Sequence, residues 1–79
     1  MKRKYNLSKK VTEEQAAKAM EEMQKITGFG EAEFADDRTA LIVTADDDKI
    51  THVMNRSVNI FARVCDETKI SFDSFIYED

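Results

Sequence analysis

Val11-Thr12-Glu13-Glu14-Gln15-Ala16-Ala17-Lys18 is the stretch from which the fold can be worked out. Thr12 is followed three residues later by Gln15, which is the spacing of a capping box. In that motif the threonine hydroxyl accepts a hydrogen bond from the glutamine amide, and the glutamine side chain reaches back to the threonine amide. Glu13 and Glu14 place negative charge in the first turn, where the helix dipole favours it. The stretch therefore predicts the start of a helix.

An apolar face continues this helix. Its predicted members recur at three- and four-residue steps and are Ala16, Ala17, Met20, Met23 and Ile26. Gly28 follows, and glycine adopts the left-handed conformation that ends many helices without a steric cost. The pattern predicts an amphipathic helix of about four turns between Val11 and Gly28.

Four other segments have the patterns of strands. Residues 2–7, 31–35 and 70–77 alternate apolar and polar side chains, whereas residues 39–44 are apolar on both sides. The alternation in residues 70–77 slips near Phe75, which predicts a bulge or a frayed end.

A second helix is predicted over residues 49–64. The three aspartates at 46–48 precede it and are expected to cap its start. Its predicted inward stripe is Ile50, Val53, Met54, Ser57, Phe61 and Val64, with Val58 and Ile60 at the margins.

The predicted order is strand, helix, strand, strand, helix, strand. This order is typical of the split β-α-β, or ferredoxin-like, arrangement. Right-handed crossovers would place both helices on one face of a four-stranded antiparallel sheet. We therefore expect an α+β sandwich formed by residues 1–79 as a single domain, with lysines, acids and Ala40 or Ile42 on the open face of the sheet.

Composition excludes several classes of function. The net charge is −4 and lysines are mixed with acids along the chain, which argues against a nucleic-acid-binding surface. No apolar run approaches the ~18 residues of a membrane span, so direct membrane insertion is not expected. A single cysteine excludes an intrachain disulfide and fits a reducing, cytoplasmic environment.

The scaffold positions resemble those of the heavy-metal-associated domain, the module of copper chaperones and of the N-terminal tails of zinc- and cadmium-transporting P-type ATPases. The resemblance covers roughly residues 2–65. The positions that carry it are Lys4-Tyr5-Asn6-Leu7, Ala16-Ala17-Lys18, Gly28-Phe29, Ala32, Phe34, Leu41 and Val43.

In that family the junction between the first strand and the first helix carries a Cys-x-x-Cys metal loop. Thr12 and Gln15 stand at the two cysteine positions here. The resemblance thus implies the scaffold without its thiolate ligands. It predicts a non-catalytic interaction or regulatory module linked to metal transport, with no cofactor and with a transporter, another protein or itself as partner.

Two alternatives stay open. One is weak binding of a divalent metal by acidic residues and Cys65 around the vacated loop, within one chain or across a dimer. Its candidate ligands are Glu13, Glu14, Asp36, Asp37, Cys65, Asp66 and Glu67. The simpler interpretation is that the acidic residues lie exposed in helix caps and turns, and that Cys65 is a semi-buried apolar side chain. The other alternative is strand addition of a partner to an exposed edge of the sheet.

Other chemistry finds little support in the sequence. The aspartates at 46–48 do not begin an EF-hand loop, because Thr51 and Ser57 replace its glycine and closing glutamate. His52 has no nucleophile at a meaningful spacing and is expected on an exposed helix face. Tyr5 and Phe34 are expected to point into the core rather than to form an RNA-binding platform. An enzyme is not predicted.

Overall fold

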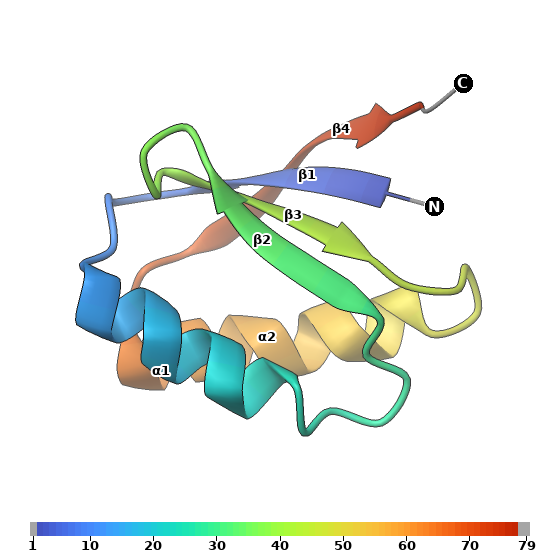
Figure 1. Cartoon of the computed structure of the whole chain (residues 1–79), viewed down its shortest axis with the longest axis horizontal. Coiled ribbons are helices and arrows are strands. Elements are labelled where there is room, and N and C mark those ends of the chain that lie inside the picture. The colour runs from blue at the N-terminus through green and yellow to red at the C-terminus, as the bar shows by residue number, and fades with distance from the viewer. Residues whose placement is uncertain (1, 78–79) are drawn as a thin grey trace.

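The computed structural model describes residues 2–77. Its elements are β1 (Lys2–Leu7), α1 (Glu13–Met23), β2 (Glu31–Ala35), β3 (Ala40–Thr44), α2 (Ile50–Val64) and β4 (Ile70–Ile76). The four strands form one antiparallel sheet in the order β2-β3-β1-β4. Both helices cover the same face of this sheet (Figure 1). The predicted ferredoxin-like α+β fold is confirmed.

The start of α1 is as predicted, because its determinants are local. The Thr12 hydroxyl accepts from the Gln15 amide and the Gln15 side chain accepts from the Thr12 amide, each at 3.0 Å. The helix nevertheless ends at Met23, so the predicted end at Gly28 is wrong. The chain tightens there into turns with bonds such as Ile26 N–H to Met23 O (3.0 Å), and Gly28 takes its positive φ of 89° inside the connection to β2.

The buried face of α1 is also shifted from the prediction. Ala17 is exposed, whereas Ala19 is fully buried. The reason is geometric: Ala16, Ala19 and Met23 follow one another at three- and four-residue steps, and Ala17 lies about 100° away from Ala16.

The start of α2 differs from the prediction as well. No aspartate side chain caps it, since the N-cap residue is Lys49 and makes no side-chain cap bond. The Asp46 carbonyl instead accepts from the amides of Lys49 and Ile50, both at 2.9 Å, so a main-chain turn does the capping. The buried residues of α2 are Ile50, Val53, Met54, Ser57, Ile60 and Phe61. Ile60 is thus inside and Val64 only half-buried, while Val58 is 45% exposed.

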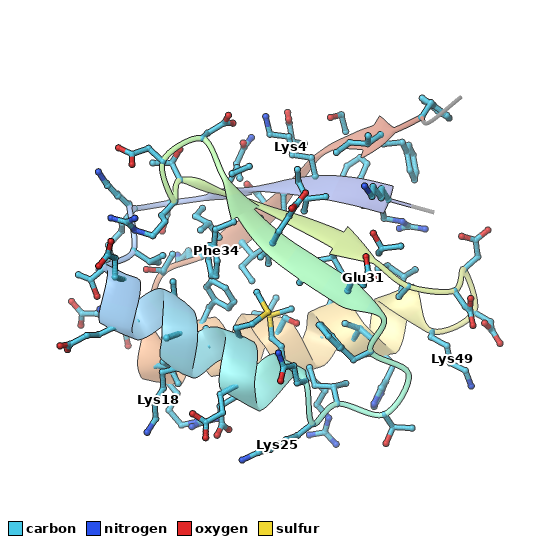
Figure 2. The ribbon with its side chains drawn as sticks, viewed as in Figure 1. Lys4, Lys18, Lys25, Glu31, Phe34 and Lys49 are labelled. Atoms are coloured by element: carbon cyan, nitrogen blue, oxygen red, sulfur yellow. The ribbon has the colours of Figure 1, made fainter. Side chains whose placement is uncertain are left out.

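The layer between sheet and helices holds the core. Tyr5 and Leu41 are buried there as predicted, and Phe34 points from β2 toward the helices (Figure 2), with its ring centroid 6.0 Å from that of Phe61. Lys4 lies on the open face of the sheet, away from the helices (Figure 2), and pairs with Ile42 of β3. The alternation of the strands therefore fixes which side chains the helices cover.

The alternation in β4 is interrupted, as predicted, but at Asp73, two residues before the predicted position at Phe75. Tyr5 pairs with Phe72, and the next residue toward the N-terminus, Lys4, pairs with Ser74. Asp73 is therefore an extra residue, a β-bulge. Because of it, Phe72 and Phe75 lie on the same, helix-side face although they are three residues apart.

Neither helix among residues 2–77 combines the length and the hydropathy needed to cross a membrane.

Candidate functional site

We call the end of the sheet at which β1 leads into α1 the loop end; main-chain bonds between three loops hold it together. The Leu7 amide donates to Thr39 O, Ser8 to Lys69 O and Val11 to Arg38 O, at 2.9–3.1 Å. These bonds bring the β1–α1 connection, the β2–β3 turn and the α2–β4 turn side by side. The candidate metal ligands named from the sequence therefore lie on loops at one end of the sheet.

Most acidic candidates at this end are paired with cations. Lys10 Nζ lies 2.6 Å from Asp37 Oδ2, and Lys4 Nζ lies 2.7 Å from Asp36 Oδ2. Further pairs join Arg38 to Glu13 at 3.9 Å and Lys9 to Asp66 at 3.6 Å. The Lys10 ammonium holds the pKa of Asp37 below its ordinary value. Glu14 and Glu67 are exposed.

Cys65 is only 1% exposed. Its Sγ lies 3.8 Å from the carbonyl oxygen of Gln15. Burial raises the pKa of the thiol, which disfavours the thiolate that a metal would need. Within residues 2–77, no three His, Cys, Asp or Glu side chains come close enough together to hold a metal ion.

A second feature is a shallow basic groove between the helices. Its volume is about 330 Å³ and its lining includes Lys25, His52, Arg56 and Arg63, together with Glu22. Glu22 is half-buried and pairs with Arg63 at 3.3 Å and with Lys25 at 4.0 Å. His52 is exposed, as predicted.

The third feature, which the sequence did not predict, is a row of uncovered aromatic side chains on β4 and on the residue that follows it. We call Phe72, Phe75 and Tyr77 the aromatic row; they are 50%, 39% and 80% exposed. The rings touch in series, with centroids 5.1 Å apart for Phe72–Phe75 and 6.4 Å apart for Phe75–Tyr77. Arg3 adds a cation over the Phe75 ring, with Cζ 5.0 Å from its centroid.

The row is exposed because β4 leaves the helix layer. Figure 1 shows β4 starting beside the C-terminal end of α2 and running away from both helices toward the chain terminus. Only the first part of the strand faces α2. There the α2–β4 groove, about 480 Å³ in volume, is lined by Val58, Ala62, Glu67, Thr68, Lys69 and Ile70.

No known protein family, curated protein or solved structure matches this chain. The resemblance to heavy-metal-associated domains therefore stays a prediction from the sequence. Of the three features, the aromatic row and the adjoining α2–β4 groove expose large apolar side chains, and contiguous exposed apolar surface commonly marks an interaction site.

The signal that could have revealed the row is the slip itself. In regular alternation Phe72 and Phe75 would lie on opposite faces of the sheet. A bulge between them unites the two on one face, and Tyr77 follows on that face two residues later.

Proposed function

We propose that this chain is a non-catalytic interaction module that binds a polypeptide along β4 and the adjoining side of α2. The observation that carries the proposal is the aromatic row, three contiguous rings that the helices leave uncovered. Aromatic side chains are enriched at protein interfaces because they supply a large apolar contact area at a low entropic cost.

The position of the row suits a peptide-binding role. β4 is an edge strand, so its outer main-chain groups are open to a partner strand. A partner lying along this edge would place its side chains on the row and in the α2–β4 groove. The link to metal transport rests on the family resemblance alone, and the absence of catalysis rests on the lack of a nucleophile–base pair in the sequence.

Selection from a random-peptide library on the immobilised chain tests this proposal. Selected peptides are then titrated into the ¹⁵N-labelled protein. We expect amide shifts in residues 70–77 and around Val58 and Ala62. Phe72→Lys should abolish binding, whereas Ala17→Lys, which adds the same charge at an exposed position of α1, should not. Peptides that shift the loop end or the basic groove instead would overturn the proposal.

A metal titration tests the alternative of a carboxylate–thiolate metal site. Zn(II), Cd(II) and Cu(I) are added under reducing conditions to the wild-type chain and to Cys65→Ser. We expect amide spectra without local shifts near Glu13–Gln15 or Cys65–Glu67. Shifts at both places at low micromolar metal, lost in Cys65→Ser, would instead make this chain a metal-binding protein.

A further inference from the structure

We propose that the partner on β4 is a second copy of this chain, with the two β4 strands paired antiparallel about a two-fold axis. The inference rests on the proposed function and names its partner. It would join two four-stranded sheets into one continuous sheet, with β4 no longer an edge.

The two edges of the sheet differ in how they are protected. β2 carries exposed Glu31 and Glu33, and charged side chains are a common device against edge-to-edge pairing. β4 offers serines at 71 and 74 and one acid, Asp73, at the bulge. Self-association by strand pairing is therefore expected at β4 rather than at β2.

The bulge favours a copy of the same strand over an ordinary peptide. A regular strand laid along β4 would lose register at Asp73, because β4 has one residue more than its neighbour there. An antiparallel copy has the same extra residue. When the axis passes between Asp73 and Ser74, the two bulges face each other and the ladder stays in register on both sides.

This register also matches the faces of the side chains. It places Phe72 opposite the partner's Phe75, and Ile70 opposite the partner's Tyr77. All four positions lie on the helix side, since Ile70, Phe72 and Phe75 pair with Leu7, Tyr5 and Arg3 of β1, respectively. Phe75 would then be covered by the guanidinium of Arg3 on one side and by the partner's Phe72 on the other.

A two-fold axis perpendicular to the sheet keeps the helix side of one copy on the helix side of the other. Both aromatic rows therefore meet on the helix side of the joined sheet. Their exposed parts amount to roughly 350 Å² per copy, taking ~150–250 Å² for a whole aromatic side chain. Both rows would thus supply about half of an interface of ~1,200–1,600 Å². The strand main chain and the α2–β4 groove supply the rest.

Arg3 also supports an interface at β4. Its Nε is buried and has no hydrogen-bond partner within the described part of the chain. A guanidinium that is partly desolvated in the monomer loses less on being covered further, and its stacking on Phe75 strengthens as water leaves.

Disulfide trapping tests the register directly. In a Cys65→Ser background, the pair Ser71→Cys and Ile76→Cys places the two thiols opposite each other across the axis. Within one chain these positions are about 17 Å apart along the strand, too far for an internal bond. We expect a covalent dimer on mild oxidation, with a linkage from residue 71 to residue 76 by mass spectrometry. Ser71→Cys alone should stay monomeric on denaturing gels, and equally rapid cross-linking of that single variant would overturn the register.

Sedimentation equilibrium tests the association itself. The wild-type chain is expected to be a dimer, and Phe72→Lys and Tyr77→Lys are expected to be monomers with unchanged circular dichroism. Ala17→Lys is the matched control and should remain a dimer. A wild-type chain that is monomeric at NMR concentrations overturns the homodimer; if library peptides still bind β4, the proposed function survives that result. A dimer that both β4 variants retain overturns the assignment of its interface to β4.

Discussion

Among residues 2–77, five side-chain-bearing residues adopt positive φ, all in the two turns at the loop end of the sheet: Asp36, Asp37, Arg38, Asp66 and Glu67. Aspartate tolerates this conformation better than most residues, because its short polar side chain bonds locally. Glutamate and arginine have no such advantage. The loop end is therefore under conformational strain that its ion pairs and main-chain bonds must offset.

Glu67 is the position where this strain can be relieved most simply. Its φ is 60° and its amide donates to Ala62 O at 2.9 Å, in the turn that ends α2. Glycine removes a strain of about 1–2 kcal/mol but loses ~0.5–1 kcal/mol through the unfolded chain. We expect Glu67→Gly to raise the free energy of unfolding in urea by roughly 0.5–1 kcal/mol. Glu67→Ala keeps the strained backbone and should give no gain; equal stability of the two variants would contradict this account.

Asp37 makes the stability of the loop end depend on pH. Its hydrogen bond to Lys10 and the charge of Lys10 lower its pKa in the folded protein. A lowered folded-state pKa contributes stability that is present above the ordinary value of 3.8 and is lost as pH falls through the folded pKa. Carboxyl-detected NMR titration should show this low pKa, and Lys10→Met should return it to the ordinary range. Since the pair is exposed, added salt should weaken the shift. A pKa that Lys10→Met leaves unchanged would contradict the assignment of its cause.

At the scale of elements, α1 depends on its capping box. Thr12 and Gln15 stand where the family that the chain resembles has its metal-binding cysteines. Here their side chains accept hydrogen bonds from the main-chain amides of Gln15 and Thr12 at the start of the helix. Thr12→Ala should lower the free energy of unfolding by about 1 kcal/mol. Thr12→Ser should retain most of the wild-type stability because serine keeps the hydroxyl. Urea unfolding of both variants measures the difference. Equal losses in the two would show that the threonine methyl, rather than the cap, matters.

The elements also show what a sequence can and cannot predict. The helix start at Thr12, the order of helices and strands along the chain and the inward faces of β1 and β3 follow from local chemistry and periodicity, and the structure confirms them. The helix end at Met23 does not, because the tightening of its last turn depends on the route of the chain to β2. The aromatic row was missed for a similar reason. A bulge is defined by pairing with the neighbouring strand, so the sequence of β4 indicates a slip near Phe75 but does not place the extra residue at Asp73.

At the scale of the whole molecule, a homodimer couples stability to concentration. Association of folded chains, but not of unfolded ones, shifts the unfolding equilibrium by mass action. The thermal midpoint of the wild-type chain should therefore rise with protein concentration. The midpoint of Phe72→Lys should be independent of concentration, and that of Ala17→Lys should follow the wild type. Calorimetry over a wide concentration range measures this, and parallel behaviour of the two lysine variants would contradict the homodimer.

The position of β1 has a consequence for how the chain folds during synthesis. Of the four strands, β1 is synthesised before the others, yet it lies inside the sheet and pairs with β4, which is synthesised after the others. Lys2 faces Ile76, so this pairing closes a loop of nearly the whole described chain. A nascent chain halted before Ile70 can form both helices and three strands, but it exposes one bare edge of β1. Chaperones that hold unpaired strands would bind β1 in such a chain, and pairing of the newly synthesised β4 would end that contact.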